Sequence, residues 1–281
     1  AMFVSIATYA KPENRTRAMT LVRLAVNLGF AAGPALGGLI IIGIGYNGLF
    51  WIDGASCITS ILIFRLLVKE KKKTATPETF IEENAKTTSF YKDYPFQLLL
   101  LSSFLTTLIF FQLFTTLPLY HSEQYGLTEF HTGLLMSFNG QMVFFFEMPI
   151  VSYMERHNVP KVKIIFWGVV CMTLAFMCLL IDVWAGILII NVVFLTFGEI
   201  FCFPFTNSFA FGRAPKGREG QYMALYTMTF SLAHTLSSKT GMGIIANKGY
   251  SYNWVFMSLI GIVSAFAILA LHRMLKKETA I

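Results

Sequence analysis

Long apolar runs joined by short turns constrain the fold of this chain more than any motif does. After a short apolar stub at residues 1–10, eight runs are each long enough to cross the ~30 Å hydrocarbon layer of a bilayer as a helix. They cover residues 17–44, 49–68, 96–120, 129–153, 162–181, 184–209, 221–245 and 253–273. Because backbone groups in lipid must be paired within the protein, we predict an all-α, polytopic membrane protein whose consecutive helices are antiparallel neighbours.

The composition agrees, and the distribution of charge predicts an orientation. Hydrophobic residues make up 55% of the chain, charged residues only 13%, and the mean hydropathy is +0.61, which together exclude a soluble domain. All Lys and Arg residues except Lys239 and Lys248 lie at or near one set of alternate connections. By the positive-inside rule these connections are cytoplasmic. We therefore predict a multi-pass protein of the cell membrane with a cytoplasmic C-terminus, and the net charge of +7 requires no nucleic-acid partner.

A polar segment at residues 69–95 divides the apolar runs into two and six. The segment begins with Lys69 and four more charged residues and is too polar to bury a core. We predict three parts: residues 1–68 with the stub and two helices, a cytoplasmic linker at 69–95, and a six-helix half at 96–281. The stub is too short to cross a bilayer, so we expect it to be the tail of a helix that begins upstream.

The first run carries an unusual set of small residues and a proline. Gly29, Gly33 and Gly37 are spaced by four, and Pro34 and Gly38 interrupt the same run. Glycines at this spacing form a smooth face against which another backbone can pack closely. The backbone groups that Pro34 frees have no water in lipid, so we expect a neighbouring helix or a local adjustment to satisfy them.

The order Arg23, Asn27 and then this Gly-Pro block resembles the fifth helix of the major facilitator superfamily. Its Gly-Pro-x-x-Gly-Gly pattern resembles the motif of drug/proton antiporters within that superfamily. The long basic linker before six runs resembles the loop between helices six and seven of twelve. This resemblance implies an incomplete major facilitator bundle, in which the stub is the end of helix four and the runs are helices five to twelve. The missing N-terminal helices of the same protein are then its partners.

Two further segments resemble the same family. Glu155 and Arg156 lie in a short connection similar to the charged loop between helices eight and nine, which implies a latch between helices. Gly198-Glu199, followed by Pro204, resembles helix ten of multidrug-type members. The resemblance implies a secondary transporter that works by alternating access.

Ionisable residues inside the runs are candidates for proton coupling. An ionised side chain at the bilayer centre costs at least ~2.5–3.5 kcal/mol, so it faces protein or a wet cavity. We select Glu199, Glu147 and His234. Structural interpretations remain open, because Glu147 lies near a basic loop and an interior histidine is often only a hydrogen-bonding group. Lys239 lies close enough to one surface to extend its ammonium into the interface.

Other polar residues form stripes at helical spacing and are candidates for the wall of a substrate cavity. The resemblance implies that helices seven, eight, ten and eleven line that cavity, and the stripes fall on those helices. The candidates are Gln112, Thr116, Gln141, Asn191, Thr206, Ser231, Ser238 and Lys239. Runs 162–181 and 253–273 are nearly uniformly apolar by contrast.

The predicted function is proton-coupled export of small amphipathic molecules. A nutrient or peptide importer of the same fold is an alternative, and a non-transporting remnant or regulatory half is another. A membrane enzyme is disfavoured, because the five histidines are scattered and no phosphate-binding loop occurs. The four cysteines lack metal-ligand spacing, so no metal or other cofactor is expected.

Overall fold

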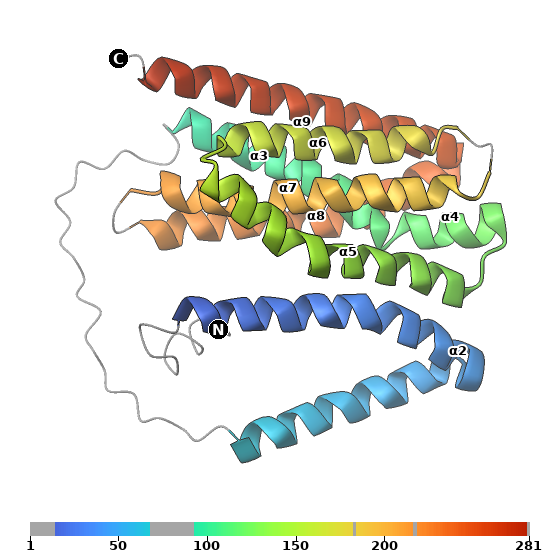
Figure 1. Cartoon of the computed structure of the whole chain (residues 1–281). Helices are drawn as coiled ribbons and strands as arrows, with labels where there is room; N and C mark the ends of the chain where they lie inside the picture. Colours follow the sequence, from blue (N-terminus) through green and yellow to red (C-terminus); the bar gives the residue numbers. More distant parts are fainter. Residues whose placement is uncertain (1–14, 68–92, 182–183, 216–217, 280–281) are drawn as a thin grey trace. The chain divides into compact units, whose positions relative to one another are not determined.

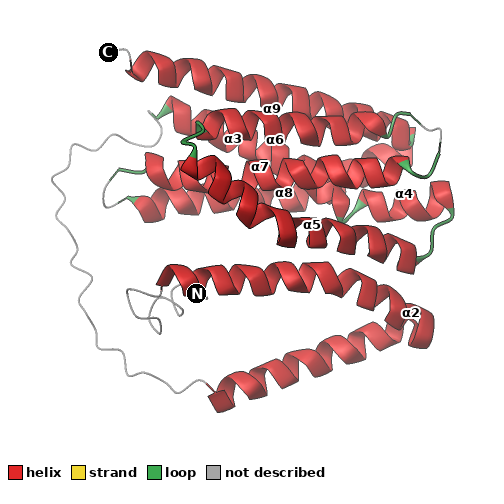
Figure 2. Ribbon diagram, viewed as in Figure 1, coloured by secondary structure: helices red, strands yellow, loops and turns green. Residues whose placement is uncertain are grey.

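The computed structural model describes residues 15–67, 93–181, 184–215 and 218–279, with the side chains of 15–24, 27 and 279 excepted. The predicted stub and nearly all of the predicted linker lie outside these residues. Every regular element in the described part is a helix (Figures 1 and 2). The elements are α2 (Arg15–Leu67), α3 (Tyr94–Phe110), η3 (Phe111–Leu113), α4 (Thr116–Tyr125), α5 (Glu129–Arg156), α6 (Lys161–Cys178), α7 (Ile187–Arg213), α8 (Glu219–Lys248) and α9 (Tyr250–Thr279). The all-α prediction is therefore confirmed.

Six helical segments in the described residues are long and apolar enough to cross a membrane. They are Leu28–Leu67, Tyr94–Tyr125, Glu129–Arg156, Lys161–Cys178, Ile187–Arg213 and Tyr250–Glu278. The first of them lies in α2, which covers the predicted span 17–44 and nearly all of 49–68 because it is helical throughout except at Gly45, where φ is 74° and ψ is −179°. Figure 1 shows the chain reversing at this kink. α8 is 30 residues long, but it is not among the six because it carries many polar residues.

The chain divides into two compact units that share α5. The first unit contains the described parts of residues 1–82 together with Thr128–Phe144, and the second contains those of 83–127 and Phe145–Ile281. The first half of α5 thus belongs with α2, and its second half belongs with α3 to α9.

In the first unit, α2 and the first half of α5 approach backbone to backbone. A Cβ atom added at Gly38 would lie 2.7 Å from the Cα of Phe130, and one added at Gly140 would lie 2.6 Å from the backbone nitrogen of Ala31. The backbone N–H of Ala35 donates a hydrogen bond to Ser137 Oγ at 3.1 Å. The N–H of Ala35, beside Pro34, therefore has its partner on the neighbouring helix. Pro34 itself lacks the N–H that would bond the carbonyl oxygen of Phe30, and a partner for that carbonyl stays a prediction.

The contact face of α2 is offset from the predicted glycine face. Nothing lies within 4 Å of a Cβ added at Gly29 or Gly33, and only the Leu49 side chain, at 3.8 Å, approaches one at Gly37. The contact with α5 uses Ala31 and Gly38, which are seven residues apart and so share a different face of the helix. A packing role for the spaced glycines remains a prediction that needs a neighbour outside the described residues.

In the second unit, small residues bring α6 and α7 together. A Cβ at Gly168 would lie 2.9 Å from the backbone nitrogen of Cys202, and one at Gly198 would lie 3.0 Å from the carbonyl oxygen of Gly168. Asn191 Nδ2 of α7 donates to the carbonyl oxygen of Ala175 on α6 at 2.7 Å. Close backbone packing and buried hydrogen bonds are the forces that join helices where lipid removes the hydrophobic drive.

Candidate functional site

The helix that opens the second unit is interrupted halfway. α3 ends at Phe110, and a short 3-10 turn, η3, precedes α4. The N–H of Thr115 donates to the carbonyl oxygen of Gln112 at 3.3 Å, and that of Phe114 donates to Phe111 at 3.1 Å, so the α-helical ladder is lost here. The sequence predicted one continuous run at 96–120. A 3-10 segment inside a longer helix often marks a hinge.

A buried network of polar side chains surrounds this break, with Gln112 at its centre. Gln112 is fully buried, and its Nε2 donates to the carbonyl oxygen and Oγ of Ser237 on α8 at 3.0 and 2.8 Å. Its Oε1 accepts from Thr116 Oγ1 at 2.6 Å and from Asn253 Nδ2 of α9 at 3.3 Å. Ser237 Oγ in turn donates to the carbonyl oxygen of Leu108 at 2.8 Å. The network therefore ties α8 and α9 to the interrupted helix, and we call it the Gln112 network.

Aromatic rings line the other side of the break. The rings of Phe110 and Phe203 are 4.9 Å apart, those of Phe203 and Phe230 are 5.0 Å apart, and those of Phe111 and His234 are 4.4 Å apart. Phe111 also contacts Phe230 at 5.9 Å. These five residues, from α3, η3, α7 and α8, form what we call the aromatic wall. His234 is exposed and all the phenylalanines except Phe110 are half-buried, so the wall has an accessible side.

A stripe of polar residues on α8 continues from the aromatic wall and is exposed, and the apolar Met228 and Leu232 beside it are exposed as well, at 65% and 54%. Besides His234, it presents Thr227, Ser231, Thr235 and Lys239, all exposed. A helix surface against lipid is apolar, because polar groups there lack partners. This face of α8 is suited to water or to another part of the protein.

The structure places the three proton-coupling candidates on three helices. Glu147 is 5% exposed on the second half of α5, and Glu199 is half-buried on α7. His234 belongs to the aromatic wall. Neither glutamate belongs to the Gln112 network. Their role in proton transfer stays a prediction.

The cavity candidates separate into buried and exposed groups. Asn191 and Thr206 are 0% and 4% exposed, and Thr206 Oγ1 is hydrogen-bonded to the Tyr226 hydroxyl at 2.8 Å, so both join helices as the structure stands. Gln112 and Thr116 lie together in the Gln112 network. Exposed positions belong to Gln141, Ser231 and Lys239, and a half-buried one to Ser238. Their role in binding a substrate stays a prediction.

The predicted latch residues make no ion pair within the described part of the chain. Glu155 and Arg156 are exposed at the end of α5. The following turn contains Asn158 at φ 50°, in the left-handed region that asparagine tolerates. The resemblance to the charged loop therefore gives no electrostatic contact in this structure.

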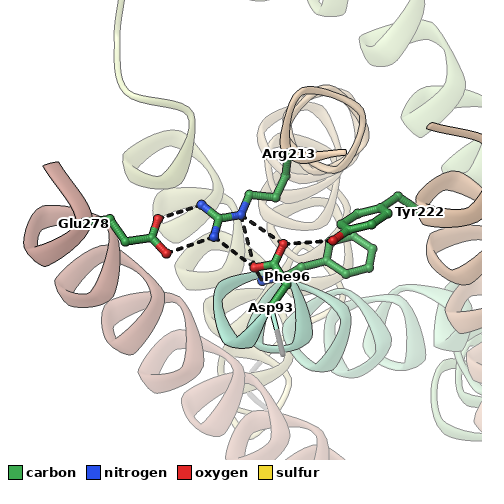
Figure 3. Close-up of polar contacts among 5 residues, drawn as sticks. All are labelled: Asp93, Phe96, Arg213, Tyr222 and Glu278. Carbon is green, nitrogen blue, oxygen red and sulfur yellow. Dashed lines mark hydrogen bonds and ion pairs between the residues drawn. The ribbon is translucent and has the colours of Figure 1, made fainter. Parts of the chain in front are cut away.

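An ion-pair cluster centred on Arg213 was missed by the sequence reasoning (Figure 3). Arg213, the last residue of α7, contacts Asp93 at 2.9 Å and Glu278 at 2.7 Å. Asp93 also accepts from the Tyr222 hydroxyl at 3.2 Å and caps α3 by accepting from the N–H of Phe96 at 3.2 Å. The cluster therefore joins the ends of α3, α7, α8 and α9. An Asp just before a helix with proline in its first turn is a recognisable cap signal, but its distant partners leave no local pattern.

Comparison with known proteins gives one family match and several transporters of similar fold. The sequence model of the Major Facilitator Superfamily matches residues 1–238. Among solved structures, a POT family transporter in complex with a thioalcohol-conjugated peptide is similar with a TM-score of 0.69 at 16% identity, over 95% of this chain and 71% of that one. A bacterial homologue of the iron transporter ferroportin, in its inward-facing state, has a TM-score of 0.68 at 14% identity, over 93% of this chain and 64% of that one. No curated protein matches. At such identities the structural likeness concerns the fold.

Proposed function

We propose that this chain, which belongs to the Major Facilitator Superfamily, binds and moves small amphipathic molecules as a secondary active transporter. The family and the apolar helices make it a multi-pass membrane protein with a transporter fold rather than an enzyme. One observation carries the proposal further. The aromatic wall lies beside the exposed polar face of α8, at the point where the first helix of the second unit is interrupted.

This arrangement favours a substrate with an apolar ring and polar groups. The half-buried faces of Phe111, Phe203 and Phe230 offer stacking and edge contacts, each pair contributing ~0.5–1.5 kcal/mol beyond buried area. The hydroxyls of Ser231 and its neighbours on α8 offer hydrogen bonds one or two turns away. Binding sites for small molecules are mostly apolar with a few oriented polar groups, and the wall and face together have that character.

The binding proposal is tested by substitution in the aromatic wall. In the complete protein, Phe230→Ala should weaken binding of an amphipathic fluorescent dye roughly tenfold, since losing stacked aromatic contacts costs on the order of 1–2 kcal/mol. Phe256→Ala is the matched control, because Phe256 is an exposed phenylalanine of α9 outside the wall. Equal dye affinity in wild type and Phe230→Ala would refute the site.

For coupling, we assign the proton to Glu199 first and Glu147 second. A carboxyl group in a poorly solvated cavity is stabilised in its neutral form, which lets it load and release protons at the pH of a cell. Glu199→Gln should keep substrate exchange down its own gradient while uphill transport loses its dependence on the proton gradient. Glu155→Gln, which changes an exposed carboxylate in the last turn of α5, is the control. Unchanged proton-driven uptake by Glu199→Gln in inverted vesicles would remove Glu199 from the cycle.

A peptide or nutrient importer is the second candidate. The observation that favours it is the similarity to a POT family transporter in complex with a peptide conjugate. Counterflow in liposomes separates the candidates, because an exporter of amphipathic molecules exchanges labelled dye and a peptide importer exchanges labelled dipeptide. The drug/proton antiporter assignment rests on the Gly-Pro-x-x-Gly-Gly resemblance. If the complete protein shows no flux of either substrate, the non-transporting alternative is favoured.

The proposed orientation places the C-terminus in the cytoplasm of a cell membrane protein. It rests on the alternation of Lys and Arg between connections. Single cysteines at Glu123 and Asn247, in a cysteine-free protein, should react with an impermeant thiol reagent added to sealed cells. Reaction at Lys163 instead would invert the orientation.

A further inference from the structure

The outer surface of the second unit carries an apolar groove between α6 and α9. The two helices lie side by side and run in opposite directions (Figure 1), and Thr173 fits against Gly261, where any Cβ would collide with it. The groove has a volume of about 310 Å³. It is lined chiefly by Phe166, Val170 and Met177 of α6 and by Ile262, Phe266 and Leu269 of α9. This volume lies at the lower end of the ~300–1,000 Å³ range of small-molecule sites.

The length of the groove matches one leaflet of a bilayer. Phe166 and Met177 are eleven positions apart on α6, which corresponds to ~16 Å at the helical rise of ~1.5 Å per residue. Half of the ~30 Å hydrocarbon core is about the same distance. A single acyl chain lying along the groove would therefore reach from the headgroup level to the middle of the membrane.

Two cations stand one turn beyond the end of the groove. Lys163 precedes Phe166 on α6, and Arg273 follows Leu269 on α9; both side chains are exposed. The antiparallel course of the helices brings these two positions to the same end of the unit. Among the described residues, neither side chain has a hydrogen bond or an ion pair. Glu278, the acidic residue of the same helix end, is bound by Arg213 and so does not neutralise them.

An interfacial aromatic residue marks the same depth. Trp167 lies one turn from Lys163 on α6 and is 54% exposed. Trp is enriched where the hydrocarbon meets the headgroups, since its ring is apolar and its N–H is polar. Lys163, Arg273 and Trp167 thus lie where the headgroup of a lipid seated in the groove would be.

We propose that this groove binds an anionic phospholipid, with an acyl chain between α6 and α9 and its phosphate group between Lys163 and Arg273. The apolar lining is complementary to the chain, and the two cations are complementary to a headgroup with net negative charge. A zwitterionic lipid is disfavoured because its own cationic group would lie close to the two side chains. This site is separate from the aromatic wall, and it requires only that the unit be inserted in a membrane.

The test uses Trp167 as a reporter. The complete protein is placed in nanodiscs of phosphatidylcholine that contain a small fraction of phosphatidylglycerol with brominated acyl chains, and quenching is measured in wild type and Trp167→Phe. The difference reports lipid beside Trp167. We expect the brominated anionic lipid to quench at least twofold more than brominated phosphatidylcholine at the same fraction, and Lys163→Gln with Arg273→Gln to abolish that excess. Arg65→Gln with Lys248→Gln is the matched control, because it removes the same charge elsewhere.

A second variant separates the groove from simple surface attraction. Ala265→Leu fills the groove without changing any charge, and it should lower the quenching by the anionic lipid in protein that elutes as a single folded species. Equal quenching by the two brominated lipids would overturn the proposal. So would quenching that Ala265→Leu leaves unchanged while the charge variants reduce it, because that result means a diffuse layer of anionic lipid. If Ala265→Leu does not fold, Val170→Leu at the same groove takes its place.

Discussion

Two neighbouring helices of the second unit, α8 and α9, have the same length but differ in the kinds of side chain that they expose. Each has 30 residues. The exposed face of α8 carries Thr227, Ser231 and Thr235, whereas that of α9 carries large apolar side chains such as Val263, which is 55% exposed, and Phe266, which is 65% exposed. Exposure in a membrane protein therefore describes two different solvents. From the residue types we expect α9 to face lipid, and the polar stripe of α8, which adjoins the exposed Met228 and Leu232, to face water or further protein.

The buried faces of the same helices support this distinction. α9 buries polar side chains, including Asn253 and Ser264, against the rest of the unit. Polar groups inside and apolar groups outside are the expected arrangement for a helix in lipid, where interhelical hydrogen bonds replace the hydrophobic drive. α8 also buries a polar residue, Ser237, but it is polar on its exposed side too.

The largest effect is expected from a charge placed on the lipid face. Val263→Asp on α9 should lower the fraction of folded protein strongly, because Asp at the centre of a membrane helix costs ~2.5–3.5 kcal/mol. Thr235→Asp on the exposed face of α8 should stay within about 0.5 kcal/mol, as surface substitutions do. The monodisperse fraction after heating, measured by fluorescence-detected size-exclusion chromatography, checks both. Equal damage by the two variants would mean that α8 also faces lipid.

The next effect concerns the ion-pair cluster centred on Arg213, which contacts both helices. Tyr222 of α8 and Glu278 of α9 meet through Arg213 and Asp93, so the two helices share an anchor although their faces differ. Arg213→Gln leaves Asp93 and Glu278 without their cation. We expect a loss of about 1–2 kcal/mol, which is below the ~1.5–3 kcal/mol of a buried charged hydrogen bond because the cluster is partly exposed. Thermal unfolding in detergent measures it.

Arg273→Gln is the control for that variant, because Arg273 lies at the same end of α9 and is exposed. Its melting temperature should match that of the unmodified protein. A comparable loss in both variants would attribute the effect of Arg213→Gln to net charge and not to the cluster.

The reaction rates of single cysteines compare the exposed faces of α8 and α9 directly and do not depend on the stability of the fold. Single cysteines at Thr227 and Thr235 on α8 should react with a water-soluble maleimide roughly tenfold faster than cysteines at Leu259 and Val263 on α9, since the reactive thiolate forms only in contact with water. The four native cysteines are first replaced by alanine. Reaction rates in liposomes are the measurement. Similar rates on both helices would show that the polar face of α8 is covered in the complete protein.

The long helices could be predicted from the sequence because the length of an apolar run reflects the thickness of the bilayer. The interruption after Phe110 has one local signal, Pro118 in the first turn of α4, which has no N–H to bond the carbonyl oxygen of Phe114, and the prediction of a continuous run passed over it. The partners that meet there, Ser237 and Asn253, lie more than a hundred residues away along the chain. The face of α2 that contacts α5, which contains Gly38 and not the spaced glycines, also depends on a distant partner. Small residues on several faces of one helix show that it can pack closely, and only the neighbour determines which face is used.

The site was predicted unevenly for the same reason. Gln112, Thr116, Ser231 and His234 were identified because a polar residue inside an apolar run is conspicuous in sequence. The phenylalanines of the aromatic wall were not, because Phe is also common on surfaces that face lipid. The Arg213 cluster joins four helix ends, and each of its charges taken alone resembles an ordinary charge at a membrane surface.

The smallest expected effect tests the buried side of the comparison. Ser264 of α9 is fully buried, and its Oγ lies 2.7 Å from Ser102 Oγ and 2.9 Å from Thr106 Oγ1 on α3. Ser264→Ala should cost about 0.6 kcal/mol, the average for a hydrogen bond between membrane helices, because Ser102 and Thr106 can each turn to a carbonyl of their own helix. Ser231→Ala on the exposed face of α8 removes only a 3.4 Å bond to Thr227 of the same helix and should cost nothing measurable. Unfolding of both variants in detergent gives the two values. A larger loss from Ser231→Ala would mean that its hydroxyl is buried against protein, and α8 would then be a packed helix with no accessible polar face.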